Sequence, residues 1–255
     1  MPYEIVTIPC LADNYAFLIG NADTREAAIV DVPDAAPINA ELARRGWTLT
    51  TVLLTHHHWD HVDGLDDLTG REGLVVIGAQ ADALRLPPLS RAVGEGDTID
   101  VLGAPAHIID VSGHTLGHIA FHMPSLDAVF TADSLMALGC GRLFEGTPAQ
   151  MFESLQKLQS LPEDTVVYSG HEYTATNAKF AATIEPGNST LISRIDVTET
   201  ARKAGTPTVP SSLRLERATN PFLRAHIPQI ADHLGMSGAS AVEVFTEVRK
   251  RRDNF

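Results

Sequence analysis

The segment TVLLTHHHWDHVDG, residues 51–64, constrains what this chain can become more than any other stretch. Four histidines and two aspartates fall between His56 and Asp63, directly after an apolar run of the kind that forms a buried strand. Ionisable groups at the end of a buried strand lose their hydration unless another partner replaces the water. The segment therefore predicts a metal site at the end of a strand.

The spacing of the ligands favours two ions over one. His56 and His58 are two residues apart in extended chain and point the same way, whereas His57 points the other way. Asp60 and His61 come where we expect a helix to start and to continue through residue 70. Adjacent residues at a helix start diverge, so this pair does not easily join the first two histidines around one ion.

Two ions need further ligands, because each takes about four or five, water included. His114, Asp133 and His171 each follow a strand-like run, and we take them as candidates. Asp133 lies midway in the ligand order and is the natural carboxylate bridge between the ions. A purely structural role stays open for these three. We interpret the remaining histidines as structural: His57, His107, His118, His122, His226 and His233.

The order of the predicted elements indicates an α/β architecture. Short strands, with a helix over residues 36–46 and another that Thr147 caps, fill the chain as far as residue 173. Beyond that point convincing strands disappear and helical periodicity prevails. The segment 206–230, rich in Pro and Ser, is typical of a loop with short turns.

Charge and cysteine content narrow the functional classes. The net charge is −13, which on average repels nucleic acid and anionic membranes. No apolar run is long enough for a transmembrane helix, and we see no signal peptide. Two cysteines far apart in sequence suit a reducing compartment. We expect a cytoplasmic monomer that acts on a small molecule.

The motifs T-H-x-H-x-D-H, GHTLGH, TADS and SGHEYT together resemble the metallo-β-lactamase superfamily. Within it the chain resembles the hydroxyacylglutathione hydrolase (glyoxalase II) family over nearly its whole length, including IPCLADNYAFLI, GCGRLFEGT, TNPFLR and the basic C-terminus. The resemblance implies an αββα sandwich with a smaller helical domain. It places a catalytic domain at residues 1–173 and a glutathione-binding domain at residues 174–255.

The resemblance also implies a binuclear centre and a reaction. One ion is assigned to His56, His58 and His114, the other to Asp60, His61 and His171, with Asp133 bridging. Zinc is the expected metal, with iron and manganese as alternatives. The implied reaction is hydrolysis of the thioester S-D-lactoylglutathione to D-lactate and glutathione, the second step of methylglyoxal detoxification.

The chemistry suits such a centre. A water between two divalent ions is largely hydroxide near neutral pH and attacks the thioester carbonyl. A metal ion stabilises the negative charge that develops on the carbonyl oxygen. Asp133 bridges the ions and Asp60 helps to hold the hydroxide, so both are expected to be catalytic. The leaving group is a thiolate and needs no dedicated general acid. Asp31 is either an orienting partner of a ligand or a simple turn residue.

The C-terminal segment AVEVFTEVRKRRD carries the cations that an anionic substrate needs. Helical periodicity places Arg252 in the middle of the apolar face and Arg249 on its border. Periodicity alone fits two interpretations equally: contact with an anion, or a solvated helix end. The resemblance favours the first. By position it also implies substrate contacts from Arg142, Phe144, Tyr173 and Asn177, with Arg142 and Phe144 replacing the usual Lys and Tyr.

Other functions are compatible with parts of this sequence. The main alternative is a glutathione persulfide dioxygenase, which would use mononuclear iron on the same fold. A β-lactamase and an RNA-processing nuclease are weaker candidates, and a non-catalytic metal-binding protein would bind metal without thioester turnover. Cys140 is interpreted as a buried structural thiol, not as a nucleophile.

Overall fold

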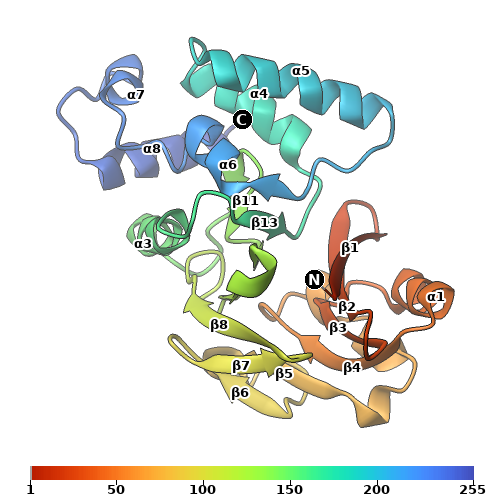
Figure 1. Ribbon diagram of the computed structural model, residues 1–255. Helices are drawn as coiled ribbons and strands as arrows, with labels where there is room; N and C mark the ends of the chain where they lie inside the picture. Colours follow the sequence, from red (N-terminus) through yellow and green to blue (C-terminus); the bar gives the residue numbers. More distant parts are fainter. Residues whose placement is uncertain (1) are drawn as a thin grey trace. The chain divides into compact units, whose positions relative to one another are not determined.

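The computed structural model describes residues 2–255, which form two compact units (Figure 1). The first unit contains the residues up to Asp110 together with Leu116–Thr131. The second contains Val111–Thr115 and Ala132–Phe255. Each unit therefore draws on discontinuous segments of the chain, and each is described by itself.

The first unit holds two sets of paired strands. Its elements are β1 (Tyr3–Cys10), β2 (Asn14–Asn21), β3 (Glu26–Val30), α1 (Ala35–Arg45), β4 (Thr48–Leu53), α2 (Trp59–Val62), β5 (Val75–Ala79), β6 (Arg91–Val93), β7 (Thr98–Val101), β8 (Ala104–Asp110), β9 (Ile119–Met123) and β10 (Ala128–Ala132), the last of which runs into the second unit. Strands β1 to β6 form one sheet in sequence order, antiparallel from β1 to β3 and parallel from β3 to β6. Strands β7, β8, β9 and β10 pair antiparallel in that order.

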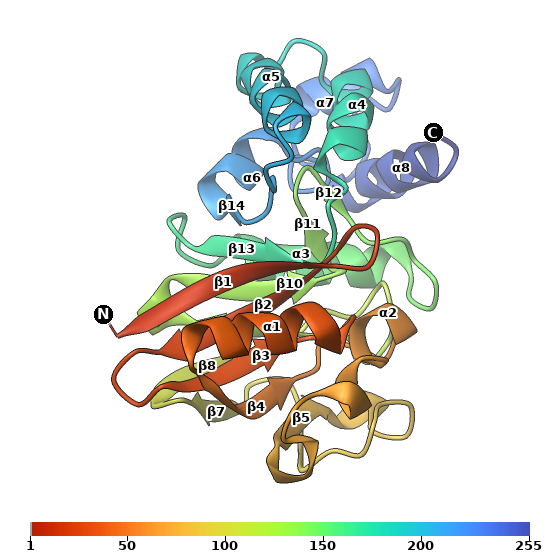
Figure 2. The ribbon, with the colours of Figure 1, turned by 90° about the vertical axis from the view of Figure 1, so that its right-hand side faces the viewer.

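Side chains alternate along β2 between the two faces of the first sheet, and each face packs against a different layer. Leu18 belongs to an apolar cluster with Ile38 and Leu42 of α1, so the helix covers one face of the sheet. Figure 2 shows α1 lying along this face. The neighbouring residue Phe17 points to the other face and contacts Phe130 of β10, with ring centroids 5.9 Å apart. Helix, sheet and sheet thus form successive layers.

The second unit is mostly helical. Its elements are β11 (Leu135–Met136), β12 (Gly139–Cys140), α3 (Pro148–Gln159), β13 (Val166–Ser169), α4 (Thr174–Ile184), α5 (Ser189–Lys203), β14 (Ser211–Ser212), α6 (Leu213–Thr219), α7 (Pro228–His233) and α8 (Ala241–Asp253). Strands β11 and β12 form a small hairpin, and β13 pairs with β14. Helices α4 and α5 lie side by side (Figure 1).

The helix boundaries expected from capping residues are confirmed. Helix α1 ends at Gly46, which adopts the left-handed conformation, φ 63°, that glycine tolerates. Helix α3 begins with a capping box: Thr147 accepts a hydrogen bond from the backbone N–H of Gln150, whose side chain accepts from the backbone of Thr147. The α/β architecture with a helical C-terminal region is also as expected.

Two local predictions are wrong. The helix expected through residue 70 stops at Val62, and the backbone N–H of Gly64 donates instead to Val32 of the preceding loop. The segment 206–230 is not merely a loop, because it contains β14, α6 and the first residues of α7. Ser212 caps α6 by accepting from the backbone N–H of Leu215. The Pro and Ser residues of the segment 206–230 therefore flank short helices, and tertiary packing stabilises these helices.

Among the described residues, no helix is long and apolar enough to cross a membrane. The predicted boundary between residues 173 and 174 differs from the division into compact units and stays a prediction.

Candidate metal centre

In the first unit, Asp31 lies beneath the histidine segment and organises it. It is buried, and its Oδ1 accepts a hydrogen bond from the backbone N–H of Thr55 at 2.9 Å. Its Oδ2 accepts from the Thr55 hydroxyl at 2.8 Å and from Nδ1 of His61 at 2.8 Å. Thr55 Oγ1 in turn lies 3.0 Å from Nδ1 of His56. One carboxylate therefore fixes both histidines.

These contacts determine which ring nitrogens can bind a cation. Because Nδ1 of His61 faces a carboxylate, it carries the proton of the neutral ring and Nε2 keeps a lone pair. The hydroxyl of Thr55 donates to Asp31, so it accepts from Nδ1 of His56, which also leaves Nε2 with a lone pair. Donor atoms of Asp31, His56 and His61 all lie within 4.8 Å of one another.

His58 and Asp60 complete the set of the first unit. Nδ1 of His58 lies 3.2 Å from Nε2 of His56, as expected for ligands two residues apart in extended chain. A carboxylate oxygen of Asp60 lies 4.0 Å from Nε2 of His61. The side chain of Asn14 donates to the same carboxylate at 3.1 Å and to the Asp60 backbone carbonyl at 3.0 Å.

His57 has a separate environment, as the alternation predicts. Its Nδ1 lies 2.8 Å from the buried carboxylate of Asp82, which also binds Arg85. His118 stacks on His56, with ring centroids 4.5 Å apart, and its Nδ1 lies 3.1 Å from the carbonyl of Ile119. Both fit the structural role assigned to them.

The second unit brings together the other three predicted ligands. Oδ2 of Asp133 lies 3.4 Å from Nε2 of His114 and 3.3 Å from Nε2 of His171. All three side chains are buried. Nδ1 of His114 lies 2.7 Å from the backbone carbonyl of Arg142, so it carries the proton and the lone pair of Nε2 faces the carboxylate. Two acceptors held this close repel each other unless a cation or a proton lies between them.

The residues present therefore fit divalent metal ions. Imidazole lone pairs with carboxylate oxygens are a donor set that zinc, iron and manganese accept. In His61, His56 and His114 the opposite ring nitrogen is held by a carboxylate, a hydroxyl and a backbone carbonyl respectively, the usual arrangement around ligand histidines. Asp31, which orients His56 and His61, and Ala132, which directly precedes Asp133, have positive φ values of 57° and 39°, and such strain clusters at functional sites.

Three of the predicted substrate residues are exposed on the second unit. The Phe144 ring is 61 % exposed and meets the ring of His114 edge-on, with centroids 5.2 Å apart. The exposed Arg142 places its guanidinium 5.7 Å from the Phe144 ring centroid. Tyr173 stacks on His171, with centroids 4.7 Å apart. These three side chains thus lie beside the predicted ligand histidines of their own unit.

The other three predicted substrate residues, Asn177, Arg249 and Arg252, are less exposed and contact one another or the hairpin of β11 and β12. Asn177 donates to the Ala137 carbonyl at 3.0 Å and accepts from Arg252 at 3.3 Å. Arg249 is buried, donates to the Cys140 carbonyl at 3.0 Å and to Asp253 at 2.7 Å.

The expected order of the two arginines on α8 is reversed. Arg249, placed on the border of the apolar face, is buried, whereas Arg252, placed in its middle, is only half-buried. Arg249 is accommodated because its guanidinium lies 5.3 Å from the ring centroid of Phe222 and has hydrogen-bond acceptors inside the unit. Helical periodicity contains no information about such partners.

Both cysteines are free and buried. Burial raises the pKa of the Cys140 thiol to about 11, although the neighbouring Arg249 lowers it in part. A thiol with this pKa is protonated near neutral pH and is a poor nucleophile. The interpretation of Cys140 as a structural thiol agrees with this.

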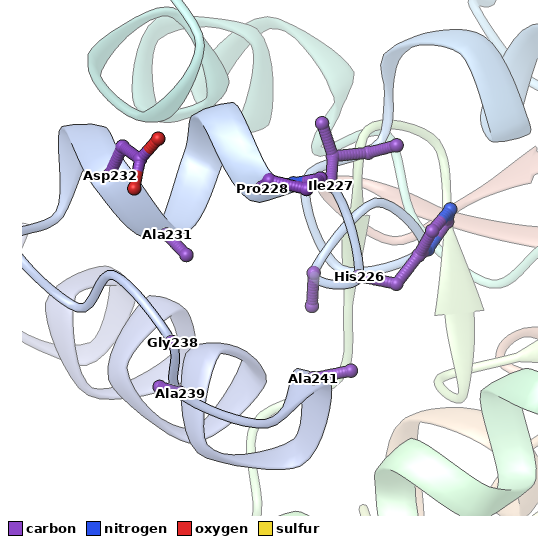
Figure 3. Close-up of a pocket in the computed structure, with 9 residues that line it drawn as sticks. His226, Ile227, Pro228, Ala231, Asp232, Gly238, Ala239 and Ala241 are labelled. Atoms are coloured by element: carbon purple, nitrogen blue, oxygen red, sulfur yellow. The ribbon is translucent and has the colours of Figure 1, made fainter.

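A cavity of about 220 Å³ lies elsewhere in the second unit, between α7 and the start of α8 (Figure 3). His226 and Asp232 are the ionisable groups among the nine residues that line it. Its lining contains no Lys or Arg and none of the predicted site residues.

The sequence predicts the candidate metal ligands but not most of the residues that orient them through hydrogen bonds. Asp31 was recognised as one of two alternatives, whereas Thr55 and Asn14 were missed. A hydroxyl directly before the first ligand histidine was the available signal for Thr55. No local pattern marks Asn14, which is 46 residues from Asp60.

Comparison with known proteins adds independent evidence. Residues 13–171 match the family described as Metallo-beta-lactamase superfamily, and residues 172–255 match Hydroxyacylglutathione hydrolase C-terminus. A Hydroxyacylglutathione hydrolase from Ruegeria pomeroyi is 62 % identical over 255 residues and covers 100 % of both chains. One from Jannaschia sp. is 61 % identical, over 99 % of this chain and 98 % of the relative.

Among solved structures, ETHE1 from Myxococcus xanthus matches with a TM-score of 0.66 and 25 % identity, over 98 % of this chain and 90 % of that one.

Proposed function

We propose that this chain, which belongs to the hydroxyacylglutathione hydrolase family of the metallo-β-lactamase superfamily, hydrolyses the thioester bond of S-2-hydroxyacylglutathiones, with S-D-lactoylglutathione as its principal substrate. The observation that carries the proposal is the Asp133 carboxylate, one oxygen of which lies against Nε2 of both His114 and His171. A carboxylate between two imidazole donors is the arrangement that a bridging ligand requires.

The proposed ligand set has seven members. One ion takes His56, His58 and His114, the other takes Asp60, His61 and His171, and Asp133 is shared. Zinc is the proposed metal, with iron and manganese as alternatives. When bound, the ions supply Lewis acidity and lower the pKa of coordinated water.

The chain's own residues supply orientation. Asp31 holds the rings of His56 and His61, so that their Nε2 atoms keep lone pairs. Asn14 anchors the carboxylate of Asp60, which we assign to accept a hydrogen bond from the attacking water. The glutathione thiolate departs without a dedicated general acid, because an ordinary cysteine thiol has a pKa of about 8.5.

Substrate binding is assigned to the side chains around the ligands of the second unit. Exposed Arg142 and half-buried Arg252 supply positive charge for the carboxylates of glutathione in a protein of net charge −13. Phe144 and Tyr173 offer aromatic surface, while Asn177 and Arg249 support Arg252 and the hairpin. A cytoplasmic location and a monomeric state complete the proposal, and the two free thiols agree with that location.

The test is release of free thiol from S-D-lactoylglutathione by the purified, metal-loaded protein. Asp133→Ala is expected to lower kcat/KM by at least about 10³-fold, because both ions lose a ligand. His107→Ala, which replaces an exposed side chain on β8, is the matched control and should keep activity within about twofold. Turnover that persists in Asp133→Ala would refute the assignment.

The persulfide dioxygenase alternative makes a different prediction. It requires one iron per chain and consumption of oxygen with glutathione persulfide as substrate. The full-length relatives named hydroxyacylglutathione hydrolase do not favour it. An oxygen electrode separates the two functions: we expect no oxygen uptake.

A further inference from the structure

The hairpin of β11 and β12 is joined at both ends to the ligands of the second unit. It begins two residues after Asp133, and at its other end the backbone N–H of Gly141 donates to Ser134 at 3.0 Å. The next carbonyl, that of Arg142, accepts from Nδ1 of the ligand His114 at 2.7 Å. A shift of this hairpin would therefore move both Asp133 and the group that orients His114.

The hairpin needs support from outside itself. Its two strands contain only two residues each, and isolated two-stranded hairpins are marginal in water. Its turn residue Leu138 has φ 58°, in the left-handed region that residues with a side chain rarely adopt. Such a conformation persists only where the surroundings hold it.

Two buried side chains associated with α6 provide this support. Oε2 of Glu216 accepts a hydrogen bond from the backbone N–H of Leu138 at 2.9 Å. Nδ2 of Asn220 donates to the carbonyl of Met136 at 3.0 Å and to that of Gly139 at 2.9 Å. Both side chains are completely buried. They therefore hold the hairpin on both sides of its turn.

Glu216 is itself fixed by other buried groups. Its Oε1 accepts hydrogen bonds from the guanidinium of Arg194 and from the hydroxyl of Ser211, the latter at 2.6 Å. Burying an ion pair carries a desolvation cost that hydrophobic residues of similar size would avoid. A buried Glu216 whose carboxylate binds a strained backbone N–H is consistent with a requirement for precise placement.

We propose that Glu216 and Asn220 are positioning residues for the metal centre, and that they act through the β11–β12 hairpin on Asp133 and His114. This inference rests on the proposed function, because it assumes that these two residues are metal ligands. The hydrogen bonds transmit the position of α6 to the hairpin, and the hairpin transmits it to the carboxylate and the imidazole.

The test uses the full-length protein with the variant Asn220→Ala. In the metal-free state, amide hydrogen exchange in residues 134–142 should accelerate at least about tenfold, because two carbonyls of the hairpin lose their donor. On titration with Co²⁺, the dissociation constant should rise by at least about tenfold and the visible absorption band should change shape. The value of kcat should fall while KM stays within about threefold.

Asn188→Ala is the matched control in the same unit. Asn188 caps α5 through Thr190 and Leu191 and donates to the carbonyl of Ala218 in α6, so its loss removes a similar number of hydrogen bonds but none that the hairpin itself makes. This variant should lose stability but keep the Co²⁺ spectrum and affinity of the wild type. If Asn220→Ala does not fold, Ser211→Ala, which removes one contact to Glu216, should raise the dissociation constant about threefold.

The outcomes are distinguishable. Unchanged Co²⁺ binding in Asn220→Ala would overturn the positioning role and leave the proposed function intact. An equal change of the Co²⁺ dissociation constant in Asn188→Ala would do the same. Wild-type protein that takes up no Co²⁺ would contradict the proposed function itself.

Discussion

At the scale of single residues, the orientation of the ligand histidines depends on a few acceptors. Asp31 makes three hydrogen bonds with one carboxylate and thereby fixes two rings. The carbonyl of Arg142 does the same for His114. Each acceptor decides which ring nitrogen keeps its lone pair, so each would orient a proposed metal ligand without itself touching the ion.

Replacing Asp31 by Asn tests this role. Asparagine tolerates the positive φ of this position, so a simple turn residue could be exchanged without loss. The amide cannot accept from Thr55 and His61 as the carboxylate does. We expect metal affinity, measured by competition with a chelator, to fall about 10–100-fold. Affinity equal to that of the wild type would make Asp31 a turn residue.

The reactivity of Cys140 tests the metal-dependent mechanism against a thiol nucleophile. Burial raises the pKa of this thiol to about 11 and that of Cys10 to about 12. Both are therefore protonated in the folded protein at pH 8, and thiolate forms only as the pH rises towards these values. We expect no reaction with a disulfide reagent at pH 8 until denaturant is added, when both react. One rapidly reacting thiol in the folded protein would contradict this.

At the scale of elements, local signals predicted those features that local interactions determine. The cap residues Gly46 and Thr147 marked the ends of α1 and α3 because their contacts lie within one helical turn. Helix α6 escaped prediction because Glu216 and the C-cap residue Asn220 make hydrogen bonds with the hairpin about 80 residues earlier. Such distant partners leave no periodic pattern in the sequence.

Helix α8 gives a prediction about its two arginines. Arg249→Ala removes a buried guanidinium with two acceptors, so we expect a loss of about 2 kcal/mol in the free energy of unfolding, measured with denaturant. Arg252→Ala removes a half-buried cation and should cost less than about 1 kcal/mol, but raise KM for S-D-lactoylglutathione about tenfold. The reverse pattern would show that the buried arginine is the one that contacts substrate.

At the scale of the whole molecule, the seven proposed ligands come from four separate parts of the chain: residues 56–61, His114, Asp133 and His171. The sequence identified them through motif spacing and family resemblance, and the structure adds how each set is oriented within its unit. The full-length relatives fix the family. What spacing cannot express is the packing that sets the ligand positions, such as the support of the hairpin by α6.

Metal binding should also contribute to the stability of the protein. Ligands that bind only the folded state stabilise it, so removing the ions with a chelator should lower Tm by several degrees, and adding Zn²⁺ should restore it. In Asp133→Ala this difference should largely vanish. A chelator-independent Tm in the wild type would contradict a centre that belongs to the folded state.

The most direct test of the central claim is a titration of the metal-free protein with Zn²⁺, in which bound metal and thioester hydrolysis are measured on the same samples. We predict that activity rises until two ions are bound per chain and then stays constant, and that Asp133→Ala remains inactive at every loading. Full activity at one ion per chain, or activity in the metal-free protein, would contradict a binuclear metallohydrolase.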